Sequence, residues 1–201
     1  MKQHVVLAPG LWMPAAAMAL LSARLQGRGY EVHVFAYSGR SAYEANVEAL
    51  ARFAREKALF VGHSLGGVLI MDMLNRHPEV QAASVVLLGA PVRGCLAGRR
   101  LGRARLGRWM LGACRAIWEE RAAGWTRGTP LGVVAGTLPL GLGRALGGGL
   151  PGPNDGVVCV EETTVDGMTG RALVRQGHSM LILSGQVCAL VDRFLASGRF
   201  A

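Results

Sequence analysis

The pentapeptide GHSLG, residues 62–66, places Ser64 between two glycines. A Gly-x-Ser-x-Gly spacing is typical of a sharp turn between a strand and a helix, which exposes the serine hydroxyl so that it can act as a nucleophile. The apolar run 58–61 before it has strand length, and residues 65–75 after it continue as a helix. The glycines allow strand and helix to approach closely, and the helix N-terminus favours developing negative charge. The same residues would also suit a glycine-rich turn with an N-capping serine. A histidine and a carboxylate that could act with Ser64 would favour the nucleophile over the plain turn.

A serine nucleophile needs a histidine base, and only one of the five histidines stands in a suitable place. His178 follows the last apolar run of the chain, in the loop RQGHSM, and lies after Ser64 in the sequence. The others open or lie within predicted strands, occupy the variable position of the pentapeptide, or end a helix: His4, His33, His63 and His77. We therefore predict that His178 is the general base, rather than a helix cap or a surface residue.

The third member of such a triad is a carboxylate that lies between the serine and the histidine in the sequence. Among the aspartates, Asp155 and Asp166 meet this condition outside the helix that follows the serine. Asp155 lies in the tight turn PNDGVV, which would hold its carboxylate rigidly, whereas the segment TVDGMTG around Asp166 is looser. We predict that Asp155 accepts the Nδ1 proton of the base, with Asp166 as the alternative. Weaker alternatives are Glu161 and Glu162.

An oxyanion formed during acyl transfer needs two backbone N–H donors. We expect one from Leu65, directly after the serine, and the other from Leu11 in the loop LAPGLWMP that follows the first apolar run. Trp12 in the same loop and Trp109 further along the chain are candidates for lining a substrate pocket.

Short apolar runs alternate with helix-like segments along the chain, which predicts a parallel sheet covered by helices on both faces. The predicted strands are 4–7, 31–37, 58–61, 84–88, 131–135 and 171–175. The predicted helices are 13–26, 42–55, 65–75, 99–122 and 180–195. We expect an α/β fold, a three-layer α/β/α sandwich with a mainly parallel sheet of about six strands. Residues 139–156 are rich in glycine and proline and are expected to form a long loop rather than a linker between domains.

Length and composition predict one soluble domain. The chain has 201 residues, of which 51% are hydrophobic and 17% charged, which is enough for a single domain over 1–201 with a full-sized core. The apolar stretch 5–21 resembles a signal peptide, but Pro9, Gly10 and Pro14 interrupt it. No uninterrupted apolar run reaches about 18 residues, so we expect a cytoplasmic protein without a membrane span. The cysteines are scattered and the histidines are not clustered in sequence, which predicts buried thiols and no metal site or disulfide.

With these residues the chain resembles the α/β-hydrolase superfamily, and within it the small, nearly cap-less bacterial lipases and esterases, including the inositol-deacylase-like group. The matching stretches cover nearly the whole chain: VVLAPGLW, VGHSLGG, VVLLGAPVRG, GPNDGVVCVEET and QGHSMLIL. The resemblance implies a triad of Ser64, His178 and Asp155 and no cofactor. The His-Gly pair common in the oxyanion loop of such proteins is Pro9-Gly10 here, which keeps the glycine but removes an imidazole.

Positive charge is concentrated between residues 93 and 127, which hold nine arginines and two glutamates, whereas the rest of the chain is nearly neutral. Leucines and tryptophans alternate with these arginines, and the segment follows a strand whose loop usually overhangs the active site in the fold that the chain resembles. We predict that residues 93–127 form a small basic lid or docking segment for an acyl chain, a lipid or an anionic surface. The plain alternative is a solvated helix. A basic run alone can also bind nucleic acid, but no nucleic-acid-binding fold accompanies it, so we do not expect that partner.

Three functions fit this sequence. The first is a serine hydrolase of carboxylic esters, esterase-like or lipase-like, which acts through an acyl-enzyme on a small-molecule or lipid ester. The second is an acyl thioesterase whose arginines meet the phosphates of an acyl carrier, and the third is a non-enzymatic binding descendant of the same fold. The complete set of candidate triad residues favours an enzyme, and the ester hydrolase is the function that we predict.

Overall fold

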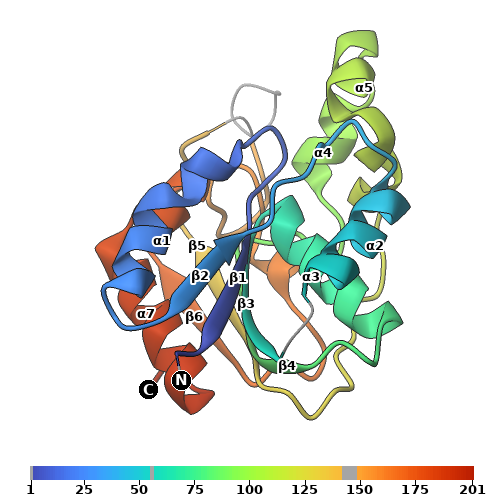
Figure 1. Cartoon of the computed structure of the whole chain (residues 1–201). Helices are drawn as coiled ribbons and strands as arrows, with labels where there is room; N and C mark the ends of the chain where they lie inside the picture. Colours follow the sequence, from blue (N-terminus) through green and yellow to red (C-terminus); the bar gives the residue numbers. More distant parts are fainter. Residues whose placement is uncertain (1, 55–56, 142–148) are drawn as a thin grey trace.

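The computed structural model of the chain describes residues 2–54, 57–141 and 149–201. Its strands are β1 (His4–Ala8), β2 (Glu31–Val34), β3 (Ala58–His63), β4 (Ala82–Leu88), β5 (Leu131–Gly136) and β6 (Gly170–Val174). They form one six-stranded sheet in the order β2-β1-β3-β4-β5-β6 (Figure 1). Every neighbouring pair runs parallel. The six predicted strands are therefore confirmed, and the sheet is wholly rather than mainly parallel.

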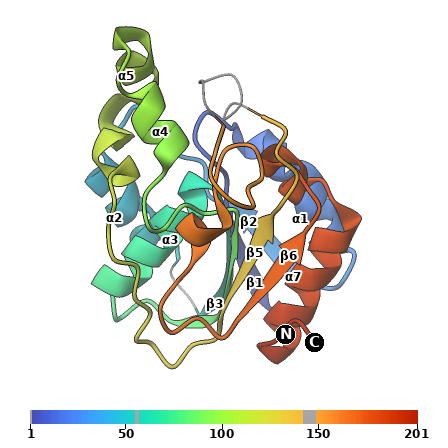
Figure 2. The same ribbon diagram turned by 180° about the vertical axis from the view of Figure 1, so that it is seen from behind.

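Helices cover both faces of the sheet, which confirms the three layers (Figure 2). One face carries α1 (Ala19–Gln26) and α7 (Gly185–Ser197), and the other carries α2 (Tyr43–Phe53) and α3 (Leu65–Arg76). Successive β1 side chains alternate between two apolar cores, because Val5 and Leu7 pack with α1 and α7 whereas Val6 and Ala8 pack with α2 and α3. Helix α2 buries positions 43, 46, 47 and 50, the spacing of an amphipathic helix.

The long helix predicted over residues 99–122 is wrong. The segment forms two short helices, α4 (Leu96–Leu101) and α5 (Arg105–Leu111), and then the 3₁₀ helix η2 (Gly112–Trp118). A glycine ends each of the two α-helices, at Gly102 and Gly112. Gly112 has a φ of 54° and a ψ of −136°, a conformation that glycine adopts more readily than any residue with a Cβ atom.

Two other predicted helices are divided in a similar way. Residues 13–26 contain the 3₁₀ helix η1 (Ala15–Met18) before α1, and residues 180–195 begin within the 3₁₀ helix η4 (His178–Ile182) before α7. Helix α7 begins after Ser184, whose hydroxyl accepts a hydrogen bond from the amide of Val187. Capping of this kind satisfies a backbone donor that has no partner inside the helix. Of the long loop predicted over 139–156, residues 142–148 lie outside the described residues.

The buried thiols predicted from the sequence are confirmed, because Cys95, Cys114, Cys159 and Cys188 are all buried and none forms a disulfide. Burial raises the pKa of the Cys95 thiol to about 12, since its thiolate would lose hydration. No described helix is both long and apolar enough to cross a membrane.

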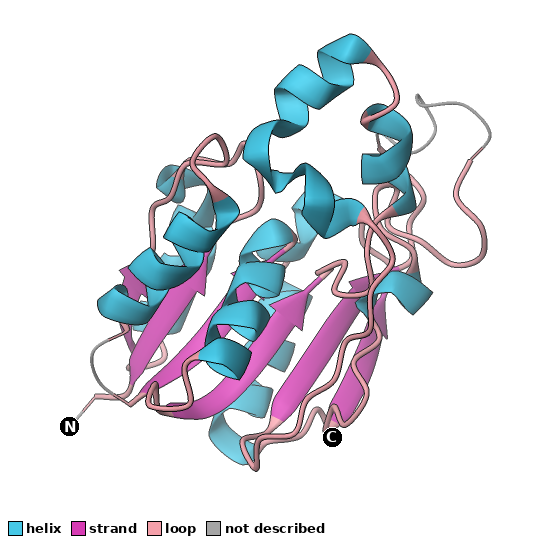
Figure 3. Ribbon diagram, turned by 90° about the vertical axis from the view of Figure 1, so that its right-hand side faces the viewer, coloured by secondary structure: helices cyan, strands magenta, loops and turns pink. Residues whose placement is uncertain are grey.

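All strand carboxyl ends meet at one edge of the sheet, because every strand runs in the same direction. Figure 3 shows short helices beyond the arrowheads of the strands, and α4 and α5 are among them (Figure 1). Open parallel sheets bind their ligands at this edge. The loops that follow β3, β5 and β6 carry Ser64, Asp155 and His178 respectively, so the fold brings all three to the same end of the molecule.

Candidate active site

Ser64 lies on a strained turn between β3 and α3. Its backbone has a φ of 53° and a ψ of −124°, a region that residues with a Cβ atom rarely adopt. A Cβ atom on Gly62 would lie 2.4 Å from the Cα of Gly67, and one on Gly66 would lie 2.2 Å from the backbone oxygen of Ala8. The glycines around the serine are therefore required for the close approach of strand and helix, as the sequence predicted. The Ser64 amide donates to the oxygen of Leu88, which fixes the turn to β4.

Asp155 and His178 form a buried pair. The Nδ1 atom of His178 lies 2.7 Å from Oδ2 of Asp155, and the Asp155 side chain is 1% exposed. Since a carboxylate only accepts, Nδ1 carries the proton and donates it. This hydrogen bond selects the histidine tautomer whose Nε2 is a free base, which is the form that a serine nucleophile requires.

The backbone around the pair holds it rigidly. Oδ1 of Asp155 accepts hydrogen bonds from the amides of Val157, at 3.0 Å, and Val158, at 2.7 Å. The amide of His178 donates to the backbone oxygen of Asp155 at 2.9 Å. A Cβ atom on Gly89, which follows β4 with a φ of 54°, would lie 3.0 Å from Oδ2 of the carboxylate. A side chain at this position would therefore crowd Asp155 and His178.

Ser64 and His178 both line a cavity of about 170 Å³. Most of the other lining residues are apolar, and they come from the loop after β1, from the segment containing α4, α5 and η2, and from the loop after Asp155: Leu11, Trp12, Met13, Pro91, Cys95, Ala97, Leu101, Leu111, Trp118, Val157 and Val158. In the described part of the chain, the only non-glycine residues with positive φ are Ser64 and Trp12, at 53° and 63°. Both strained residues lie at this cavity, and strain of this kind concentrates at functional sites.

The two residues predicted to supply the oxyanion donors lie beside Ser64 and at the cavity. Leu65 is the first residue of α3, so its N–H has no acceptor within the helix. Leu11 lines the cavity, from the loop after β1. Gly10 must be small, because a Cβ atom there would lie 3.0 Å from Nδ1 of His63 and 3.1 Å from the Cβ of Ser64. The loop thus lies directly against the turn that carries the serine, as the position of Leu11 in the sequence predicts.

His63 is a residue of the site that the sequence did not reveal, because it occupies the variable position of the pentapeptide. Its Nε2 lies 3.0 Å from the backbone oxygen of His178, so Nε2 donates to that carbonyl. The two imidazole rings are 4.8 Å apart between centroids. Burial and, to a lesser extent, the neighbouring His178 lower the pKa of His63 to about 3. His63 is therefore a neutral positioning residue that links the serine turn to the loop of the base.

His63 predicts a loss of stability in acid. The unfolded histidine takes up a proton as the pH falls below 6.5, whereas the folded one stays neutral down to about 3. The free energy of unfolding should therefore fall by up to about 1.4 kcal/mol for each pH unit across this range. Denaturant unfolding between pH 4 and pH 7 should show this slope in the wild type and a clearly smaller one in His63→Gln, which keeps an amide donor for the carbonyl. The control is His77→Gln, at a partly buried histidine paired with Glu79, which should retain the acid-side slope. Equal slopes in wild type and His63→Gln would contradict the assignment.

The alternative acids lie elsewhere. The Asp166 side chain is 71% exposed and pairs with Arg93. Glu161 is exposed, in the 3₁₀ helix η3 (Val160–Thr163). Glu162 accepts hydrogen bonds from the amides of Leu96 and Cys159 and so joins the start of α4 to η3. Only Asp155 among the candidates contacts His178.

The two tryptophans proposed for the pocket differ. Trp12 lines the cavity while remaining 51% exposed. The prediction for Trp109 is wrong, since it is 64% exposed and does not line the cavity. Its ring lies outside, beneath the guanidinium of Arg40 at 4.8 Å. The sequence could not show which side of α5 would face the cavity, and Trp118 from η2 lines it together with Trp12.

The arginines of segment 93–127 have two kinds of environment. Arg121 forms a pair of 2.9 Å hydrogen bonds with Asp72 of α3, and Arg127 donates to backbone oxygens of Leu74 and Val80. These side chains attach the end of the segment to the body of the fold. By contrast, the exposed arginines gather around α5: Arg103, Arg105 and Arg108.

The comparisons with known proteins agree with this architecture. The model of the alpha/beta hydrolase family matches residues 5–189. No curated protein sequence matches the chain. Among solved structures, the fold is similar to the mature form of Bacillus licheniformis lipase BlEst2, with a TM-score of 0.75 and 16% identity over 98% of this chain and 92% of that one. The propeptide form of the same lipase gives 0.74 and 18% identity over 90% of this chain, which spans only 47% of that form.

A second similar structure is the pyrethroid hydrolase from Sphingobium faniae JZ-2, with a TM-score of 0.63 and 14% identity over 98% of both chains. At such identities the likeness concerns the fold alone. The family match, however, covers most of the sequence and includes the strand, turn and loop positions described above. The chain therefore belongs to the alpha/beta hydrolase family.

Proposed function

We propose that the protein is a serine hydrolase of carboxylic esters that acts through an acyl-enzyme. The observation that carries the proposal is the buried 2.7 Å hydrogen bond between His178 and Asp155, beside an apolar cavity that Ser64 also lines. An acid, a base and a serine hydroxyl beside such a cavity suit acyl transfer. The lipase and the pyrethroid hydrolase that share this fold support the same reaction class.

In the proposed reaction, Oγ of Ser64 forms a bond with the ester carbonyl carbon while its proton passes to Nε2 of His178. The carbonyl oxygen becomes an oxyanion, which the amides of Leu65 and Leu11 stabilise. The imidazolium formed on His178 is stabilised by Asp155. The carbon–oxygen bond to the alcohol then breaks, and the histidine proton passes to the leaving alkoxide oxygen. A water molecule then attacks the acyl-enzyme carbonyl carbon while its proton passes to His178. The bond to Ser64 breaks, the histidine proton returns to Oγ, and the carboxylic acid is released.

Cys95 also lines the cavity, but it is a poor alternative nucleophile. Its pKa is raised to about 12 by burial, so almost none of it is thiolate near neutral pH. Its sulfur accepts a hydrogen bond from the amide of Gly98 and thereby caps α4. We infer that Cys95 has a structural role and that the reaction uses the serine hydroxyl.

The choice between an ester and a thioester can be tested with the wild-type enzyme. We expect turnover of p-nitrophenyl and glyceryl esters, with kcat/KM for the glyceryl ester at least about tenfold above that for the acyl-CoA of the same chain length. A thioester has a leaving group of lower pKa, so a preference for the glyceryl ester would have to come from the site rather than from the leaving group. Faster turnover of acyl-CoA would favour the thioesterase, and absence of any turnover would favour a non-enzymatic binding protein.

We further infer that the enzyme docks on an anionic lipid surface. The exposed side chains of Trp12, Leu106, Trp109 and Met110 form what we call the apolar patch. The indole N–H of Trp12 donates to the oxygen of Met110 at 2.9 Å, so the patch joins the rim of the cavity to α5. Arg105 and Arg108 are exposed on the same helix, and an apolar surface beside arginine suits acyl chains with anionic headgroups.

The double substitution Leu106→Ser/Trp109→Ser should weaken binding to phosphatidylglycerol vesicles by at least about tenfold, because each side chain would otherwise bury apolar surface in the bilayer. A vesicle sedimentation assay measures this, and turnover of a short neutral ester should stay within about threefold of wild type. The matched control is Leu173→Ser, on edge strand β6, where the leucine is 54% exposed. Raising the salt concentration should weaken wild-type binding, since the arginines are exposed. If the double variant binds as the control does, the patch is not a lipid-docking surface.

A further inference from the structure

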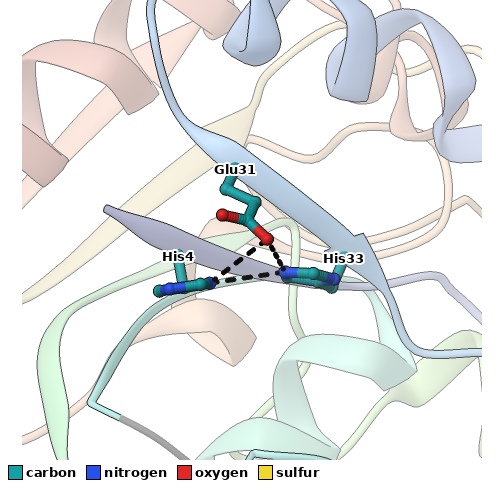
Figure 4. Close-up of side chains that lie close together, drawn as sticks. All are labelled: His4, Glu31 and His33. Carbon is teal, nitrogen blue, oxygen red and sulfur yellow. Dashed lines mark hydrogen bonds and ion pairs between the residues drawn. The ribbon is translucent and has the colours of Figure 1, made fainter. Parts of the chain in front are cut away.

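Three potential metal ligands lie together at the amino-terminal edge of the sheet. Strands β1 and β2 pair in a register that sets His4 opposite Glu31 and Val6 opposite His33. Because side chains alternate along a strand, His4, Glu31 and His33 project from the same face. Figure 4 shows the three side chains directed toward one another from the two neighbouring strands.

The distances between the donor atoms suit one small ion. Nδ1 of His4 lies 3.4 Å from Nε2 of His33, and Oε1 of Glu31 lies 3.3 Å from that Nε2 and 3.8 Å from that Nδ1. Zinc binds imidazole nitrogen and carboxylate oxygen at about 2.0–2.2 Å in a tetrahedron, so two of its ligands are separated by about 3.3–3.6 Å. Small rotations of the partly exposed side chains would bring all three distances into this range.

The surroundings leave room for an ion and a further ligand. The same three side chains line a surface cavity of about 270 Å³, together with Phe53 and Ala54 at the end of α2 and with Val6 and Ala58. The side chains are 35%, 49% and 44% exposed for His4, Glu31 and His33, so an ion can reach them from solvent. A water molecule in this cavity would complete four ligands.

We propose that His4, Glu31 and His33 bind a transition-metal dication, with zinc the ion that this donor set fits. Two imidazoles and one carboxylate match the ligands that zinc takes in proteins, and they are too few in oxygen for magnesium or calcium. The site lies at the opposite end of the sheet from Ser64. The bound ion therefore joins the edge strand β2 to β1 and stabilises the fold, and it takes no part in the reaction proposed for the cavity.

The sequence did not reveal this cluster, and its scattered histidines argued against a metal site. His4 and His33 are 29 residues apart and become neighbours only through the pairing of β1 with β2. His77 offers a contrast. Its Nε2 lies 3.1 Å from Glu48 and its Nδ1 lies 2.9 Å from Glu79, so its two carboxylates contact opposite ring nitrogens and cannot share an ion with that imidazole.

The test uses the full chain without a histidine tag, treated with a chelator and then dialysed against Zn²⁺ alone at pH 7.5. We expect one Zn²⁺ per chain, and a rise in Tm of about 5 °C at a hundredfold excess of free Zn²⁺ over Kd. His33→Gln and Glu31→Gln should each weaken binding by at least about tenfold, since even outer partners of metal ligands change affinity by that much. Binding should weaken as the pH falls, because protons compete with the metal for its ligands.

The controls separate a metal site from general attraction of cations to the surface. His77→Gln should bind Zn²⁺ with the affinity of the wild type, and Mg²⁺ should leave the Tm unchanged. The proposal is overturned by less than stoichiometric binding, by His33→Gln and Glu31→Gln variants that both bind as the wild type does, or by an equal rise in Tm with Mg²⁺. Circular dichroism of the two variants confirms that they remain folded, which their exposed positions lead us to expect.

Discussion

Ser64→Ala should lower the kcat of ester hydrolysis by a factor of at least about 10⁴, because the reaction proposed here has no other nucleophile to form the acyl-enzyme. Removal of the serine from a triad leaves only the rate that oxyanion donors and substrate binding can supply. Substrate affinity should change little, since Ala keeps the Cβ atom against Gly10. The measurement is steady-state turnover of a short p-nitrophenyl ester, together with labelling by a fluorophosphonate probe.

The control for the probe is Ser197→Ala, at the exposed end of α7, which should be labelled and turn over substrate as the wild type does. Thermal unfolding should show that Ser64→Ala is folded. If the folded variant keeps more than about one tenth of the wild-type rate, the acyl-enzyme through Ser64 must be abandoned.

Asp155→Asn should lower kcat by about 10⁴, the loss known for the same change in a serine protease triad. The carboxamide can present its NH₂ group to His178, which would favour the tautomer with the proton on Nε2 and so remove the base. The carboxylate is also the group that stabilises the imidazolium, and its Oδ1 holds the turn through the amides of Val157 and Val158. Turnover of the same ester measures the effect.

Asp166→Asn is the matched control, because it makes the same chemical change at the exposed aspartate paired with Arg93. We expect its rate to stay within about threefold of wild type. A larger loss in Asp166→Asn than in Asp155→Asn would transfer the role of the acid to Asp166.

Much of the fold could be predicted because short stretches of sequence determine where its strands lie. A short apolar run bounded by turn residues predicts a strand wherever it occurs, and all six runs form strands in one parallel sheet. The residues of the candidate site were also identified from local features, namely the glycines around Ser64 and the single histidine after the last strand. Parallel strands then require these loops to lie at one edge, whatever the details of packing.

The remaining features depend on contacts between distant segments. Whether α5 presents Trp109 or Leu111 to the cavity depends on how a broken helix packs. His63 has a neutral, buried ring because the loop of His178 covers it. The His4 and His33 cluster depends on the register of two strands. None of these relations can be read from the spacing of residues along the chain.

The backbone of Ser64 sets stability and activity against each other. Its φ of 53° and ψ of −124° suit glycine better than any other residue, so a selection for thermal resistance alone would favour replacement of the very side chain that the proposed reaction needs. The residue that would make this turn most stable is consequently not the residue that the proposed reaction needs. Natural selection would keep a serine there only while the hydroxyl is in use, and in a lineage released from that demand this position should be among the first to change.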